Sequence, residues 1–112
     1  MPELTAGVEF NTLAKEWRMK WSADDDNKSL AEAQKVLDAH LPALKALPGV
    51  KKIQRIVCGG CFDFKVILSF SMEGFGTWGQ GNFTHEESFL AAVKAIPGIS
   101  QVETQVFTIE EM

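Results

Sequence analysis

Two cysteines, Cys58 and Cys61, have a spacing that can support redox or metal chemistry. A Cys-x-x-Cys pair can close a disulfide or supply half of a tetrahedral zinc site. Catalytic dithiols usually lie at a helix N-terminus, where the helix dipole lowers the thiol pKa, whereas this pair flanks the turn dipeptide Gly59-Gly60. We therefore expect structural free thiols and no bound metal, with a labile hairpin disulfide and a zinc half-site as the alternatives.

The two histidines, His40 and His85, are the candidate catalytic residues, because imidazole can accept or donate a proton near neutral pH. Neither has a serine or cysteine partner close to it in the sequence. The sequence also has no nucleophile-elbow, phosphate-loop, metalloprotease or calcium-loop pattern. Whether the chain is an enzyme therefore stays open, and we predict no cofactor.

The glycine-rich segment 74–79 (GFGTWG) matches the Gly-x-Gly-x-x-Gly pattern of dinucleotide-binding loops. That fingerprint must lead directly into the helix that binds the pyrophosphate, but residues 80–83 intervene here, so we reject a nucleotide site. Glycines give a loop conformational freedom, and aromatic rings give it contact area. We expect a mobile loop whose Phe75 and Trp78 contact a ligand. Packing of these rings into the rim of the core is the alternative.

The elements that position these groups occur twice. Segment 45–50 (KALPGV) returns 49 positions later as segment 94–99 (KAIPGI). Each copy has an amphipathic stretch, a Pro-Gly stop and an alternating stretch, which predicts a helix that ends at a glycine and is followed by a strand. Two such units fit one domain that covers residues 1–112.

Alternation of apolar and polar residues predicts four strands, two of which form a hairpin around Gly59-Gly60. In chain order the predicted strands are 13–21, 53–57, 62–70 and about 99–109. Capping boxes that begin at Ser29 and Thr84 predict the starts of two helices, and Pro42 predicts a kink in the first one. The order β-α-β-β-α-β predicts an α+β, ferredoxin-like fold with two helices on one face of a four-stranded antiparallel sheet.

The two faces of this sheet are predicted to differ. Large apolar side chains, Trp17 and Trp21 among them, alternate onto the face under the helices. The opposite face mixes charged residues with a few apolar ones, and its candidate ligand-binding residues are Arg18, Lys20, Asp63 and Lys65. A plain solvated face explains such a mixture. The alternative is that two chains pack these faces together around a polar cavity.

Short motifs in the second half carry a family resemblance. Segment 60–64 (GCFDF), and segment 96–99 (IPGI) followed by Glu103-Thr104, are similar to the Gly-x-x-Asp turn and the Pro-Gly-Val…Thr ending of the leucine-responsive/AsnC regulators. The same superfamily of dimeric α/β barrels includes stress-responsive barrels and small antibiotic-biosynthesis monooxygenases, to which segment 44–68 is also similar. The chain departs from the regulators because no helix-turn-helix precedes the barrel. The resemblance implies a homodimeric α/β barrel with a ligand cavity or an interaction surface.

Composition and charge exclude other classes of protein. Apolar residues make up 46% of the chain and charged residues 23%, which indicates a globular domain and not a disordered one. A net charge of −4 opposes nucleic-acid binding, and the sequence shows neither a membrane span nor a signal peptide. We predict a small cytoplasmic homodimer that binds a small-molecule ligand. The alternative function is a cofactor-independent monooxygenase or cyclase that acts on a small aromatic or polyketide-like compound.

Overall fold

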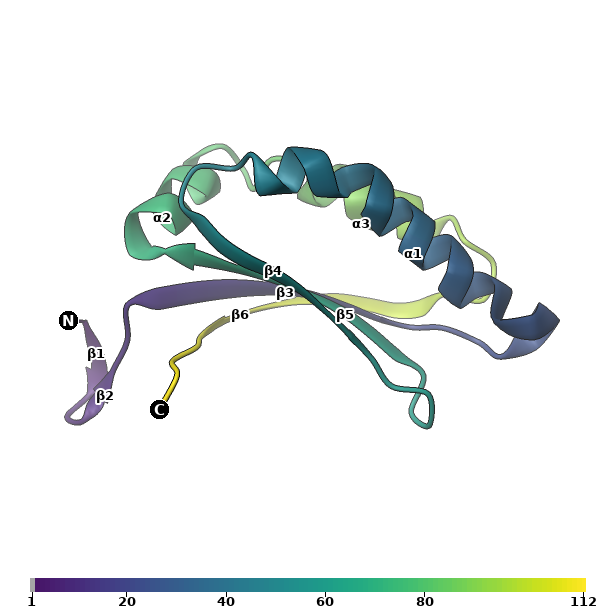
Figure 1. The fold of residues 1–112 in the computed structure, drawn as a ribbon, viewed down its shortest axis with the longest axis horizontal. Helices are drawn as coiled ribbons and strands as arrows, with labels where there is room; N and C mark the ends of the chain where they lie inside the picture. The colour runs from purple at the N-terminus through teal and green to yellow at the C-terminus, as the bar shows by residue number, and fades with distance from the viewer. Residues whose placement is uncertain (1) are drawn as a thin grey trace.

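A four-stranded antiparallel sheet forms the body of the protein, with its strands in the order β4-β5-β3-β6 (Figure 1). The computed structural model describes residues 2–112. The strands are β3 (Thr12–Lys20), β4 (Val50–Val57), β5 (Asp63–Ser71) and β6 (Ser100–Thr108). The helices α1 (Asp24–Lys45), α2 (Met72–Gln80) and α3 (Glu86–Lys94) cover one face of this sheet. The predicted α+β, ferredoxin-like fold is therefore confirmed, with one helix more than predicted.

The two Pro-Gly turns have the conformation that their glycines predict. Gly49 and Gly98 have φ values of 78° and 95°, a left-handed conformation that glycine adopts without steric cost. Each turn also contacts the first turns of a helix in the other half. A Cβ on Gly49 would lie 2.5 Å from the Cα of Gly74 in α2, and a Cβ on Gly98 would lie 3.0 Å from the Cβ of Ser29 in α1. The two copies thus hold the starts of each other's helices.

The core lies between the sheet and the helices, where sequence alternation placed the tryptophans. Trp17 is completely buried and Trp21 is 7% exposed. The ring of Trp17 stacks on Phe89 of α3 with a centroid distance of 4.6 Å, and Phe70 stacks on Trp78 of α2 at 4.7 Å. These stacked rings fasten both C-terminal helices to the centre of the sheet.

The glycine-rich segment is a helix, so the predicted mobile loop is wrong. The Ser71 side chain accepts a hydrogen bond from the backbone N–H of Gly74 at 3.0 Å and caps the first turn of α2. Trp78 is only 4% exposed, and Phe75 packs beside it. Burial of these rings outweighs the low helix propensity of glycine. The alternative, in which the rings pack against the core, is the observed one.

The helix starts and the kink also differ from prediction. Residues 25–27 form a left-handed turn with φ between 54° and 63°, and the right-handed part of α1 follows them. Ser29 lies inside α1 and its hydroxyl bonds to Ser22. Pro42 lies within α1, whose non-helical residues are confined to 25–27, so the helix continues through the proline without a restart. Helix α3 begins after His85, which has no side-chain cap, and not at Thr84.

The N-terminal arm, which we define as residues 2–11, was not predicted. Its strands β1 (Glu3–Thr5) and β2 (Val8–Glu9) form a separate two-stranded sheet. The arm extends from one end of the main sheet, on the side away from the helices (Figure 1). Leu4 is 69% exposed and Val8 is 47% exposed. The arm thus presents apolar side chains to solvent.

Candidate functional site

The uncovered face of the main sheet, which we call the open face, gathers the four polar residues that the sequence predicted. Arg18 is paired with Lys65 across β3 and β5, and Lys20 with Asp63. Side chains that are directly opposite on neighbouring strands point to the same face, so alternation in both strands brings the four together. They line a depression of about 160 Å³ whose wall also includes Gln101 and Glu103 of the β6 strand and Met19.

Asp63 is the ionic centre of this cluster. Its carboxylate lies 2.5 Å from the Lys20 Nζ and 4.0 Å from the Lys65 Nζ. The Lys20 ammonium also donates to the carbonyl of Cys61 at 2.9 Å. The hydrogen bond from Lys20, assisted by the charges of Lys20, Lys65 and Arg18, lowers the pKa of Asp63 below its ordinary value. Asp63 is therefore ionised at neutral pH, where it serves as a counter-ion and not as a proton donor.

Arg18 is held in one orientation by two neighbours on the open face. Its Nε donates to Glu16 at 2.6 Å, and its Nη2 donates to Gln105 of β6 at 3.1 Å. Glu16 is only 4% exposed although no helix covers it. A guanidinium that is fixed in this way presents its remaining N–H groups in a set direction. The arrangement is suited to hydrogen bonding with a ligand or partner, and it contains no activated nucleophile.

The open face is also hollowed at its other end. A second depression of about 400 Å³ lies between the starts of β3 and β4 and the C-terminal tail, and its lining includes Thr12, Lys52, Ser69 and Glu110. Between the two depressions Ala14 is fully buried and contributes no exposed surface. Sequence reasoning missed this second hollow because the C-terminal residues that wall it follow the last strand and have no periodic pattern.

The remaining candidate residues lie apart from the open face. Phe75 and Trp78 are in the core on the helix side of the sheet. His40 joins two helices, with its Nδ1 at 2.8 Å from the carbonyl of Val36 and its Nε2 at 3.1 Å from the hydroxyl of Ser88. His85 precedes α3 in the helix layer. The structure therefore separates the candidate catalytic histidines and the aromatic pair from the polar cluster.

A buried ion pair on the helix side was missed by sequence reasoning. The Lys15 Nζ lies 3.0 Å from a carboxylate oxygen of Glu86, and the same oxygen accepts from the indole N–H of Trp17 at 2.8 Å. The ammonium also lies 3.6 Å from the centre of the Phe83 ring. Lys15 is 7% exposed. Its signal in the sequence was a lysine in the apolar stripe of the first strand.

The two cysteines form a disulfide, so the expected free thiols are wrong and the hairpin disulfide is the observed alternative. The turn between β4 and β5 brings the Cα atoms of Cys58 and Cys61 to 5.6 Å, inside the range that a disulfide spans. Bonded to each other, these sulfurs are not available as zinc ligands.

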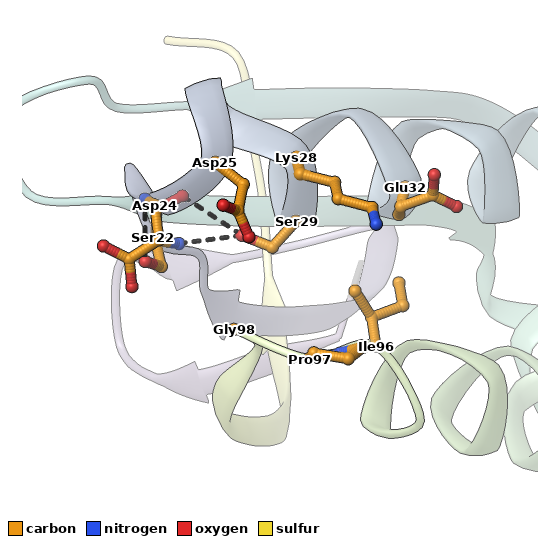
Figure 2. A pocket seen from close by; sticks show the side chains of 9 residues that line it. All are labelled: Ser22, Asp24, Asp25, Lys28, Ser29, Glu32, Ile96, Pro97 and Gly98. Atoms are coloured by element: carbon orange, nitrogen blue, oxygen red, sulfur yellow. Dashed lines mark hydrogen bonds between the residues drawn. The ribbon is translucent and has the colours of Figure 1, made fainter.

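A third depression, of about 190 Å³, lies where the second Pro-Gly turn meets the start of α1 (Figure 2). The equivalent place in the other half of the repeat is the contact between Gly49 and Gly74 of α2. Here Ser29 stands in the position of the small residue, and acidic side chains such as Asp25 and Glu32 line the rim. The hydroxyl of Ser29 is already bonded to the backbone N–H and carbonyl of Ser22, so it is not free to bind a ligand in this hollow.

The ferredoxin-like fold is also found in solved structures that have low sequence identity to this chain. The structure of Rv0793 from Mycobacterium tuberculosis matches with a TM-score of 0.62 and 14% identity, over 90% of this chain and 97% of that one. SnoaB, a cofactor-independent oxygenase from Streptomyces nogalater, matches with a TM-score of 0.60 and 15% identity, over 91% of this chain and 96% of that one. The NE2512 protein of unknown function from Nitrosomonas europaea matches with a TM-score of 0.63 and 16% identity, over 92% and 93%.

These likenesses establish the fold and leave the activity to be argued from the site. No protein-family model matches the sequence, and no curated protein matches it significantly. Among the helices within residues 2–112, none is long and apolar enough to cross a membrane.

Proposed function

We propose that this protein is a small homodimeric binding module whose two open faces pack together and enclose a polar ligand. The observation that carries the proposal is the ordered ion-pair network on a sheet face that no helix covers. Ion pairs between long charged side chains on a solvated face contribute little to the stability of the fold. Here Glu16 is held at 4% exposure by Arg18, and Lys20 is held between Asp63 and a backbone carbonyl.

The charges of this network indicate the kind of ligand. Arg18, Lys20 and Lys65 supply three cations, and the nearby carboxylates are those of Glu16, Asp63 and Glu103. Because the positive and negative charges are equal in number, the lining does not attract a strongly charged ligand and selects its ligand through hydrogen bonds. Because Asp63 is ionised at neutral pH, the cluster binds more readily than it transfers protons. We therefore favour binding of a neutral or zwitterionic polar compound over catalysis.

A cofactor-independent oxygenase of aromatic compounds is the second candidate, and the fold likeness to SnoaB favours it. In this chain the aromatic rings of Trp17, Phe70 and Trp78 fill the space between the sheet and α2. An aromatic substrate would have to displace them or use the open face. Oxygen consumption in the presence of polycyclic phenols distinguishes this candidate from a binding module.

The dimer is tested by two neighbouring substitutions on β6. Gln105→Arg places a second guanidinium beside Arg18 on the open face and should shift the protein toward monomer. Thr104→Arg is the matched control, because the next residue along a strand points to the opposite face and Thr104 is also exposed. Light scattering should give twice the chain mass of 12.4 kDa for the wild type and for the control. A wild-type monomer at micromolar concentration would refute the proposal.

A further inference from the structure

The N-terminal arm has few means of staying ordered by itself. Its two strands pair only with each other in the separate sheet, and they contain three and two residues. Isolated two-stranded hairpins are marginal in water. Ordering such a segment costs conformational entropy, which burial of apolar side chains can offset. Within one chain Leu4 and Val8 stay exposed and provide no such burial. The arm therefore has the character of a segment that docks on another surface.

A matching surface lies at the opposite end of the same sheet. The hairpin of β4 and β5 exposes Ile56 at 44%, and pairing with Lys65 places this side chain on the open face. Figure 1 shows that the arm and this hairpin turn both extend to the side away from the helices, at the two ends of the sheet.

Symmetry relates these two ends in a face-to-face dimer. A two-fold rotation that pairs the open faces and reverses the strand direction places each arm beside the partner's hairpin turn, so the contact occurs twice. Charge favours the same arrangement. The arm carries Glu9, and Lys65 lies directly across the β4–β5 ladder from Ile56 with its nearest carboxylate at 4.0 Å. The apolar and charged groups of the arm thus have counterparts on the hairpin.

We propose that the N-terminal arm is a clasp for a second copy of this chain. Leu4 of each arm packs on Ile56 of the partner subunit, and Glu9 pairs with Lys65 of the partner subunit. This inference rests on the proposed homodimer, since a monomer offers the arm nothing to clasp. It adds that the dimer is held at both ends of its interface by segments that lie outside the sheet.

The test uses the full chain with Leu4→Asp, and Ala31→Asp on the exposed surface of α1 as the control. Loss of one anchoring apolar side chain and addition of a charge should weaken dimerisation by about 30-fold or more in sedimentation velocity. The control should keep the wild-type dissociation constant. Both variants should keep the wild-type melting temperature at high protein concentration, because neither residue belongs to the core.

A cross-link supplies the second readout. Leu4→Cys combined with Ile56→Cys should give a covalent dimer on mild oxidation, whereas Leu4→Cys combined with Ala31→Cys should not. A wild-type dimer whose affinity is unchanged by Leu4→Asp, and whose Leu4–Ile56 pair does not cross-link, would overturn the clasp and leave the proposed dimer intact. A wild-type monomer would overturn both.

Discussion

Glu86→Gln tests the buried ion pair that fastens α3 to β3. Glutamine keeps the size of the side chain and an oxygen that can accept from the Trp17 indole at 2.8 Å. It removes the negative charge that lies 3.0 Å from the Lys15 ammonium. The two side chains are 8% and 17% exposed, so the ammonium is left in a site that water barely reaches. The Phe83 ring, 3.6 Å away, is then its nearest electrostatic support.

The expected cost follows from these contacts. Removing one partner of a buried pair costs about 3–5 kcal/mol, because the other charge stays buried and unpaired. The cation–π contact with Phe83 is present in both proteins, but Glu86 is 17% exposed, so some water reaches the ammonium and the cost falls toward the lower end of this range. We expect Glu86→Gln to lower the free energy of unfolding by about 2–3 kcal/mol. For a domain of this size that corresponds to a fall in Tm of about 10–15 °C.

The control is the double variant Lys15→Met, Glu86→Gln, which removes both charges and keeps an unbranched side chain at position 15. Its stability should lie within about 1 kcal/mol of the wild type, since neutral packing can replace a buried pair. The single and the double variant are each compared with the wild type by urea and thermal unfolding at pH 7, with circular dichroism as the signal. If Glu86→Gln costs less than about 0.5 kcal/mol, or if the double variant is the less stable of the two, the ammonium reaches water and the reasoning fails.

Three further predictions concern the core, the glycines of α2 and the acid range. Trp78→Ala should destabilise the fold by about 3–5 kcal/mol in urea unfolding, as truncation of a buried aromatic ring does, whereas a loss near zero would contradict its packing. Gly74→Ala should destabilise the fold, because the added Cβ would lie 2.6 Å from the Cα of Gly49. Gly76→Ala should stabilise the fold by up to about 1 kcal/mol, because nothing lies within 4 Å of its added Cβ and alanine favours the helix. Equal changes in the Tm of the two variants would refute this reasoning. The lowered pKa of Asp63 means that its pairing stabilises the fold above the ordinary value of 3.8 and is lost as the pH falls through the lowered value. The stability gap between wild type and Asp63→Asn in thermal unfolding should therefore be constant near neutral pH and should narrow only as the pH falls below 3.8, and a gap that narrows near neutral pH would refute this.

The fold was predictable because its main signals are local and occur twice. Each Pro-Gly turn marks the end of a helix by itself, and strict alternation assigns Trp17 to the face under the helices. The same alternation assigned Arg18 and Asp63 to the same face of the sheet, since the period of two in each strand fixes which side chains share a face.

The missed features depend on contacts that are distant in the sequence. A glycine-rich helix contradicts local propensity, and only the contact of Gly74 with Gly49 and the burial of Trp78 explain it. The ion pair joins Lys15 to Glu86, which are 71 residues apart. Strands β1 and β2 are too short to have a detectable period. The position of the histidines away from the open face likewise followed only from the three-dimensional arrangement.

The order of the strands bears on how such a chain can arise by duplication. Strands β3 and β4 belong to the first copy and β5 and β6 to the second, and across the sheet the two copies alternate. A half-length chain would therefore hold two strands that are not neighbours, and it could complete its sheet only with strands from another half-length chain. A chain of one repeat would then be an obligate pair, and fusion of two such chains would turn intermolecular strand contacts into intramolecular ones. Separately expressed halves of the present chain, each unfolded alone, should reassemble when mixed.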